Sequence, residues 1–287
     1  MTLPHIAIAI IINLLWGSMY IAASFGLQEF PPIFFTGIRF LLLLGLLGIF
    51  IPVPRKLIAP LFWIGLLMGV GMYLTLYMSV AMADNIASIA IFGKLEVPFA
   101  VILGVILLKE KIGIKRIAGI SIAMVGAAVI GFDPAALDDL PALFWMGVSC
   151  AFAAYAMIKI RQLGSVHPLT ITGWVSLAGA PVLLATSFLF EDNHWQTVQD
   201  ATWVGWGALL YTAIMSSIIA HSGLFYLLQR YPVGHIAPFY LLSPVFAIVG
   251  AVFLLDDELT PGLVMGSVLI LFGVGWITRR NAIRSPQ

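Results

Sequence analysis

Long apolar stretches, interrupted only by short groups of charged residues, prolines and glycines, run through the whole sequence. A helix needs about 20 apolar residues to cross a membrane, and about ten stretches of that length follow one another. They lie near residues 5–27, 31–52, 58–82, 85–108, 113–132, 141–160, 168–190, 203–228, 234–255 and 262–278. Only 9% of the 287 residues are charged, too few to cover a water-facing surface. The sequence therefore predicts an all-α membrane protein with ten transmembrane helices and no soluble domain.

The stretches are expected to be helices because each is apolar all round, whereas the strands of a membrane barrel would alternate. The first stretch has no Lys or Arg before it, so we expect a first membrane helix and not a cleaved signal peptide. The connections are a few residues each except 191–202, which is expected to be the one sizeable loop.

Basic residues gather at one set of helix ends. Cytoplasmic loops carry an excess of Lys and Arg, while acidic residues contribute little to this rule. If the N-terminus is cytoplasmic, 12 of the 14 basic residues fall at inner ends. They are Arg55, Lys56, Lys109, Lys111, Lys115, Arg116, Lys159, Arg161, Arg230, Arg279, Arg280 and Arg284. We therefore expect a multi-pass protein of the bacterial inner membrane with both termini in the cytoplasm.

The second half of the chain repeats the first. At an offset of 147 the matching pairs are Ala90 and Ala237, Phe99 and Phe246, Gly119 and Gly266, and Gly126 and Gly273. At an offset of 136 they are Pro32 and Pro168, Thr36 and Thr172, and Gly37 and Gly173. This predicts two five-helix repeats, residues 1–135 and 136–287. An odd number of helices inserts the second repeat upside down, an arrangement that places a transporter's central site near mid-membrane.

One pattern occurs in both halves: a proline and a phenylalanine, an apolar run, an acidic turn, and two glycines seven residues apart. The copies are LEVPFAVILGVILLKEKIGIKRIAGISIAMVG and LLSPVFAIVGAVFLLDDELTPGLVMGSVLILFG. With LLWGSMYIAAS and PPIFFTGIRFLLL, they make the whole chain resemble the EamA branch of the drug/metabolite transporter superfamily. Within that branch the chain is similar to YddG-type exporters of aromatic and other amino acids. The family's frequent Glu-Pro pair is here Glu96-Val97-Pro98.

Three charged residues, Arg39, Lys94 and Glu96, lie inside predicted spans. Charges in the membrane are costly, so they pair with one another or face a cavity. Lys94 and Glu96 are two residues apart and therefore point in directions about 200° apart on an α-helix. We expect Glu96 to form a structural ion pair with Arg39, and Lys94 to face the cavity and contact substrate. Snorkelling or helix packing is the alternative for Lys94.

Aromatic residues near mid-span could line such a cavity. The candidates are Trp16, Tyr20, Tyr73, Tyr77, Trp174 and Tyr240, together with His221 as a hydrogen-bonding or proton-sensitive group. Plain packing is the alternative for each. Two pairs at four-residue spacing, Trp16 with Tyr20 and Tyr73 with Tyr77, place two rings on one helix face. Such a lining suits amphipathic or aromatic solutes.

Prolines interrupt the two repeated segments. Pro98, Pro238 and Pro244 lie within predicted spans, where they free backbone groups that are tolerated only against protein or a water-filled cavity. We expect them to act as hinges, with simple packing kinks as the alternative.

Catalytic chemistry has no counterpart in this sequence. There is no phosphate-binding loop and no metal-ligand spacing, the single Cys150 is expected to serve packing, and no catalytic residue, metal, cofactor or nucleic acid is expected. The sequence favours a monomeric exporter of amino acids and related metabolites that works by alternating access. The alternatives are a drug or nucleotide-sugar exporter of the same superfamily and, less favoured, an intramembrane enzyme.

Overall fold

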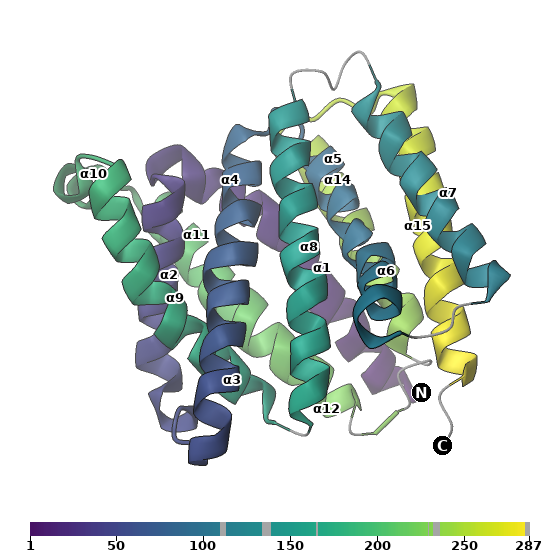
Figure 1. Ribbon diagram of the computed structural model, residues 1–287. Helices are drawn as coiled ribbons and strands as arrows, with labels where there is room; N and C mark the ends of the chain where they lie inside the picture. Colours follow the sequence, from purple (N-terminus) through teal and green to yellow (C-terminus); the bar gives the residue numbers. More distant parts are fainter. Residues whose placement is uncertain (110–112, 134–138, 165, 229, 232–235, 285–287) are drawn as a thin grey trace.

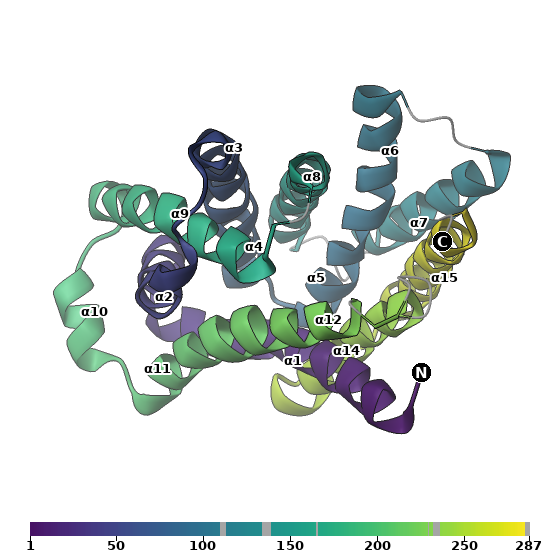
Figure 2. The ribbon, with the colours of Figure 1, turned by 90° about the horizontal axis from the view of Figure 1, so that it is seen from below.

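The computed structural model describes residues 1–109, 113–133, 139–164, 166–228, 230–231 and 236–284. These residues form helices that stand side by side, and they contain no strand. Both termini lie at the same end of the bundle, the lower end in Figure 1. Seen from that end in Figure 2, α1, α11 and α12 form one side, and α3, α8 and α6 the other.

The helices follow one another with short connections. In chain order they are α1 (Leu3–Glu29), α2 (Pro32–Leu47), η1 (Gly48–Phe50), α3 (Arg55–Gly65), η2 (Leu66–Leu74), α4 (Thr75–Met82), α5 (Ile86–Phe92), η3 (Gly93–Leu95), α6 (Glu96–Leu108), α7 (Ile114–Gly131), α8 (Leu140–Leu163), α9 (Pro168–Phe190), α10 (His194–Asp200), α11 (Trp203–Leu210), η5 (Tyr211–Ala220), α12 (His221–Leu228), η6 (Ala237–Leu241), α14 (Leu242–Leu254) and α15 (Pro261–Arg284).

Among the described residues, seven helical stretches are long and apolar enough to cross a membrane. They are Leu3–Glu29, Pro32–Phe50, Arg55–Met82, Ile86–Leu107, Leu140–Ile160, Pro168–Phe190 and Trp203–Leu224. Three shorter apolar helices, Ile117–Gly131, Phe239–Leu254 and Pro261–Ile277, occupy the places of the fifth, ninth and tenth predicted spans. The all-helical membrane architecture is confirmed, while a count of ten spans stays a prediction.

The outside of the bundle is apolar. Large side chains such as Ile106, Phe132 and Phe253 are largely exposed on helices whose opposite faces are packed in the bundle. Water would make such a surface unfavourable, whereas lipid chains match it.

The segment 191–202 is not the loop that the sequence predicts, because it contains the short helix α10. The helix is held at its start, where the His194 Nε2 and Ser187 Oγ atoms are 2.7 Å apart, and Val198 packs against the main hydrophobic cluster. These tertiary contacts explain why a polar sequence forms a helix here.

Besides the short 3-10 turn η1, four helical segments in the described ranges depart from α-helical geometry. The elements η2 and η5 are π-helices, and η3 and η6 are 3-10 helices. The two π-helices begin 145 residues apart, and η3 and η6 each precede a 13-residue α-helix, α6 or α14. In both of these helices the proline, Pro98 or Pro244, is the third residue, where a missing N–H costs little.

Helices α7 and α15 cross in close contact through glycines. A Cβ atom on Gly126 would lie 2.7 Å from the Gly266 carbonyl oxygen, and one on Gly273 would lie 2.6 Å from that of Gly119. The sequence repeat relates Gly119 to Gly266 and Gly126 to Gly273. The two contacts are therefore equivalents of each other, as in an interface formed about a twofold axis.

Acidic side chains hold together the end of the bundle opposite the termini. Each joins the first 135 residues to the rest of the chain, and we call this set the acidic caps. The links are Glu29 to the Thr202 N–H and hydroxyl, Glu191 to the Ile33 and Phe34 N–H groups, Asp139 to the Asp84 and Asn85 N–H groups, Asp257 to the Ala87 N–H, and Asp133 to the Thr260 hydroxyl.

Burial raises the pKa of Asp139 and of Asp257 above the ordinary value of 3.8, although their hydrogen bonds from backbone N–H groups act in the opposite direction. A carboxyl group with a raised pKa contributes most to folding below its unfolded pKa, and this contribution is lost as the pH rises through the folded value. Both groups are therefore protonated more easily here than in water.

At the end that carries the termini, the two halves of the chain are joined by other kinds of contact. Among the described residues, the contacts across it involve uncharged acceptors: the His5 Nδ1 and Tyr231 hydroxyl atoms are 2.7 Å apart, and the Trp276 Nε1–H donates to the Lys115 carbonyl at 2.9 Å. Hydrogen bonds to ionised groups are stronger than neutral ones. The described contacts therefore hold the acidic end more firmly.

The glycine crossing predicts a clear difference between two alanine substitutions in α7. Gly126→Ala places a methyl group against the backbone of α15 and should lower the free energy of unfolding by about 1–3 kcal/mol. Gly131→Ala, in the same helix with no atom within 4 Å of the new Cβ, should change it by less than about 0.5 kcal/mol. Thermal melting in detergent measures both, and equal melting temperatures for the two variants would contradict the packing described.

Candidate functional site

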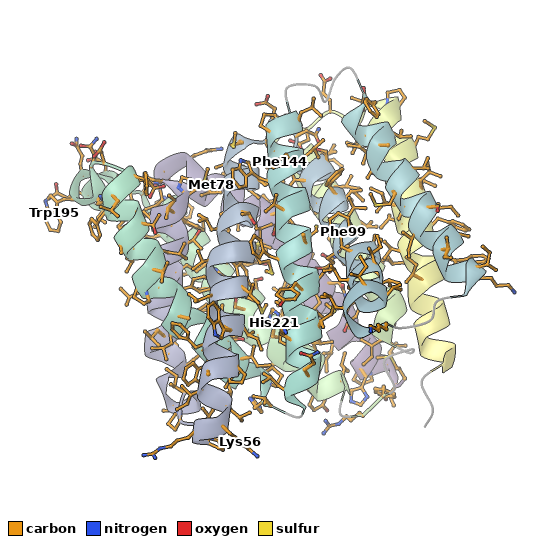
Figure 3. All side chains as sticks on the ribbon, viewed as in Figure 1. Lys56, Met78, Phe99, Phe144, Trp195 and His221 are labelled. Atoms are coloured by element: carbon orange, nitrogen blue, oxygen red, sulfur yellow. The ribbon has the colours of Figure 1, made fainter. Side chains whose placement is uncertain are left out.

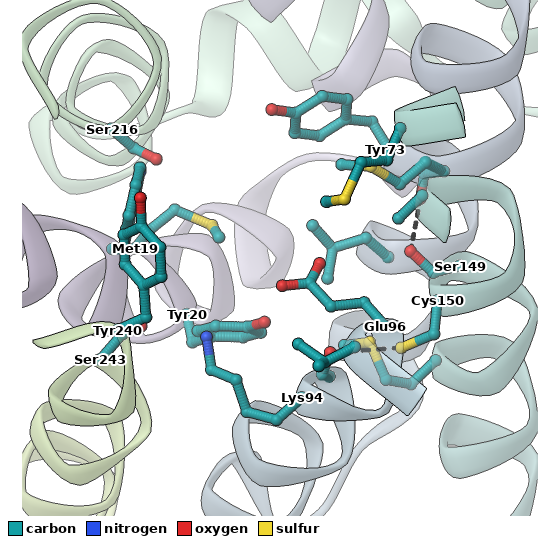
Figure 4. Close-up of a pocket in the computed structure, with 18 of the residues that line it drawn as sticks. Met19, Tyr20, Tyr73, Lys94, Glu96, Ser149, Cys150, Ser216, Tyr240 and Ser243 are labelled. Atoms are coloured by element: carbon teal, nitrogen blue, oxygen red, sulfur yellow. Dashed lines mark hydrogen bonds between the residues drawn. The ribbon is translucent and has the colours of Figure 1, made fainter. Parts of the chain in front are cut away.

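A cavity of about 400 Å³ lies inside the bundle (Figure 4). Small-molecule sites usually have volumes of about 300–1,000 Å³. Its lining comes from α1, η2, α4, η3, α6, α8, η5, α12, η6, α14 and α15. The polar lining residues are Tyr20, Tyr73, Lys94, Glu96, Ser149, Cys150, Ser216, His221, Tyr240 and Ser243.

Four of the five irregular helices in the described ranges, η2, η3, η5 and η6, contribute to this lining, and η1 does not. Irregular backbone leaves polar groups without their usual helical partners, and within a membrane this is tolerated beside protein or a cavity. The breaks also widen the space between helices. The irregular segments thus help to form the cavity, and the cavity makes their irregular backbone tolerable inside a membrane.

One face of α8 shows how the cavity is placed along the bundle. The lining residues on this helix are Met146, Ser149, Cys150, Ala153, Met157 and Ile160, which share a face at helical spacing. They cover about 21 Å of the helix and come within three residues of Leu163, where α8 ends on the side of the termini. At the other end the lining stops six residues after Leu140. The cavity thus lies nearer the terminal end.

Lys94 and Glu96 both line the cavity, which corrects the prediction that they face different ways. In Figure 4 the Lys94 Nζ atom lies beside Tyr20 and Tyr240, and the Glu96 carboxylate projects into the open space. The prediction assumed a continuous α-helix, whereas Lys94 belongs to the 3-10 turn η3 and Glu96 starts α6. Within the described chain neither charged group has a hydrogen-bond or ion-pair partner.

The predicted ion pair between Arg39 and Glu96 is not formed. Arg39 is fully buried, and its guanidinium donates to the Thr212 carbonyl at 3.1 Å and to the Ser217 hydroxyl. Its position behind the ring of Tyr73, outside the cavity lining, explains why it does not meet the acid.

Three aromatic candidates form a cluster on the cavity wall. The ring of Trp16 lies 5.4 Å from that of His221 and 6.0 Å from that of Tyr240, measured between centroids. The His221 Nδ1 atom lies 3.0 Å from the Ser216 carbonyl oxygen, and Figure 3 shows this histidine well inside the bundle, away from Lys56 at its lower end. Tyr20 and Tyr73 line the cavity from other sides.

Tyr77 and Trp174 lie outside the cavity lining. Tyr77 is fully buried and packs edge-on against Phe35 with ring centroids 5.3 Å apart. The Trp174 Nε1–H donates to the Ile51 carbonyl at 3.0 Å, near the terminal end of the bundle. Both side chains are packed inside the bundle, which agrees with the alternative to cavity lining that the sequence left open.

Five methionines that no sequence pattern singles out belong to the cavity lining. Met19, Met68, Met72, Met146 and Met157 all line the cavity. Methionine side chains are flexible and polarizable and occur at binding surfaces that accept varied partners. Methionine is an ordinary residue in membrane helices, so the sequence alone does not mark these five. They are identified only by the sides of α1, η2 and α8 that face the cavity.

The remaining predicted residues have defined places. Pro98 and Pro244 lie in the first turn of α6 and α14, the helices that follow η3 and η6, and Pro238 is the second residue of η6. Their role as hinges stays a prediction. Cys150 is buried, and its thiol donates to the Gly93 carbonyl at 3.3 Å. In the described ranges no group of three or more His, Cys, Asp or Glu side chains could hold a metal ion.

The different places of two tryptophans predict different fluorescence responses. Trp16 lies on the cavity and Trp174 does not. A ligand entering the cavity should change the tryptophan emission of the wild type and of Trp174→Phe, and this change should be lost or much reduced in Trp16→Phe. A ligand-induced change that persists in Trp16→Phe and disappears in Trp174→Phe would place the ligand elsewhere.

Similarity to known proteins agrees with this arrangement. The EamA-like transporter family matches residues 3–132 and again residues 140–279. The chain is 26% identical to the "Probable amino-acid metabolite efflux pump" of Salmonella typhimurium, covering 96% of both chains. It is 25% identical to the Escherichia coli protein of the same name, covering 93% and 92%. An "Uncharacterized transporter" of Archaeoglobus fulgidus is also 25% identical, over 93% and 95%.

A solved structure shares the fold, with a TM-score of 0.65, 19% identity and 99% coverage of both chains. The resemblance noted from the repeated motifs is therefore confirmed over nearly the whole length. The chain belongs to the EamA-like transporter family.

Proposed function

We propose that the protein is a secondary transporter that exports neutral and aromatic amino acids. The observation that supports this proposal is that Lys94 and Glu96, one cation and one anion, line the same cavity without a partner among the described residues. An unpaired charge inside a membrane protein is costly. A zwitterion supplies a carboxylate for the ammonium group and an ammonium group for the carboxylate.

The rest of the lining suits the side chain of such a substrate. Tyr20 and Tyr240 lie near Lys94, and the ring of Trp16 lies 6.0 Å from that of Tyr240. The five methionines contribute to the apolar part of the wall. Aromatic and thioether groups pack favourably on aromatic rings. The names of the two bacterial relatives, which refer to amino-acid metabolite efflux, support the same cargo and direction.

A cationic drug is the second candidate cargo. Glu96 and the surrounding rings could hold an apolar cation through charge and cation–π attraction. Nucleotide sugars fit less well, because their phosphates need several cations. Lys94 is the lining cation among the described residues, and Arg39 is buried behind Tyr73.

Transport by alternating access needs two conformations related by the repeats. The two family matches, the paired irregular segments and the equivalent glycine contacts support inverted repeats with a boundary near residues 135 and 136. In this proposal the bundle is closed by the acidic caps, and the cavity communicates with the cytoplasm at the terminal end. The protein acts as a monomer in the bacterial inner membrane.

Purified protein in proteoliposomes should transport labelled Phe, Thr or Met. Lys94→Met and Glu96→Gln should each reduce the ratio of Vmax to KM at least about tenfold, because each removes a charge-assisted contact worth about 1.5–3 kcal/mol. Lys94→Met should also lose the preference for Phe over phenylalaninamide, which lacks the carboxylate. Both variants should melt near the wild-type temperature, since neither group has a partner in the described part of the chain.

Asp192→Asn, at an exposed position outside the cavity, is the control and should transport normally. Wild-type transport rates in both charge variants would refute the zwitterion site. Uptake of nucleotide sugars without any amino acid would reverse the order of the candidates.

The orientation can be tested separately. In a Cys150→Ala background, Asp192→Cys should react with an impermeant thiol reagent on cells with an intact inner membrane. Lys56→Cys should react only after lysis, because the positive-inside rule places this end in the cytoplasm. Both positions are exposed. Lys56 lies at the lower end of the bundle in Figure 3, and Asp192 shortly precedes α10, which lies at the upper end in Figure 1. Labelling of Lys56→Cys from outside would reverse the orientation.

A further inference from the structure

Arg39 is a buried cation without an acidic partner among the residues that the structure describes. It is 0% exposed, and its guanidinium carbon lies 4.8 to 5.6 Å from the ring centroids of Phe40, Tyr73 and Tyr77. Within the same residues its Nε and Nη1 atoms have no hydrogen-bond partner. Burying a charge in this way is expensive and is usually connected with function in a membrane protein.

The polar contacts of the guanidinium all come from one nitrogen and go to one turn of helix. This nitrogen donates to the Thr212 carbonyl and to the Ser217 hydroxyl, both in the π-helix η5. The two residues are five apart, which is the spacing between hydrogen-bonded residues in a π-helix. In an α-helix residues five apart are separated by about 140° around the axis, so one nitrogen would not reach both.

The same five-residue spacing orients the residues that reach the cavity. His221 bonds to the carbonyl of Ser216, and both side chains line the cavity. A change of η5 from π to α register would turn the helix beyond this point relative to the part before it. Ser216 and His221 would then no longer present the same groups to a substrate.

Arg39 also contacts the second π-helix. Tyr73, whose ring carries the shortest of the three cation–π contacts, belongs to η2 and lines the cavity. The guanidinium of α2 thus lies between the two π-helices, with polar contacts to one and ring contacts to the other.

From this geometry we infer that Arg39 is a positioning residue for transport: it holds η5 in the π register, and so keeps Ser216 and His221 directed into the cavity. The expected effect of Arg39 on substrate binding rests on the proposed transport function. Its effect on the geometry of η5 does not depend on which substrate is transported.

Hydrogen–deuterium exchange and transport kinetics test the role together. Arg39→Met should increase exchange over residues 212–221 at least about tenfold, and Arg39→Lys should increase it less, because an ammonium group keeps a donor in place. Ser217→Ala, a milder change that leaves the charge, should also speed exchange there and raise the KM for Phe several-fold with little change in Vmax.

Ser79→Ala is the matched control, since it removes a buried hydroxyl that donates to the Ala142 carbonyl in α8, outside η5 and the cavity lining. It should leave both exchange over 212–221 and the KM unchanged, whatever its melting temperature. Equal exchange in Ser217→Ala and Ser79→Ala, or unchanged exchange in Arg39→Lys and Arg39→Met, would overturn the inference. Failure to transport any amino acid, with exchange altered as expected, would instead refute the proposed cargo alone.

Discussion

The need of every backbone N–H and C=O group for a partner inside the membrane governs this structure. Regular α-helices satisfy it by themselves, and most of the chain follows that solution. Changes between α-, π- and 3-10 hydrogen bonding interrupt that solution. The two π-helices and two of the three 3-10 turns in the described ranges border the cavity, where substrate or water can take over missing contacts, and outside the lining Arg39 donates to the Thr212 carbonyl of η5. Most departures from regular helices thus lie where the fold can bind something.

Much of the fold was predictable, because lipid makes apolar length a strong signal. Helix ends near Glu29, Pro32, Pro168 and Phe190 agree with the sequence within a few residues, since prolines and charges mark them. The helix α10 was missed because its polar sequence depends on contacts with Ser187 and the core, which no local pattern reveals. Irregular helices were equally invisible, as their sequences are ordinary apolar runs.

The candidate site was predicted less well, for one geometric reason. Lys94, Trp16, Tyr20, Tyr73, His221 and Tyr240 line the cavity as expected. Glu96 and Arg39 were assigned to each other on the assumption of ideal α-helices. The 3-10 turn η3 changes the direction of Glu96, and Arg39, on the regular helix α2, meets acceptors of the π-helix η5 instead. Depth along a helix can be read from a sequence, whereas direction around it depends on every turn being regular.

The acidic caps have a genetic consequence. Apart from the Thr202 and Thr260 hydroxyls, the donors in these links are backbone N–H groups. A backbone donor is present whichever residue is encoded, unless it is proline. Such a link can therefore be strengthened, weakened or removed in one step by a codon change at the acid alone, without a matching change at its partner. How firmly this end of the protein closes can drift or be selected one residue at a time.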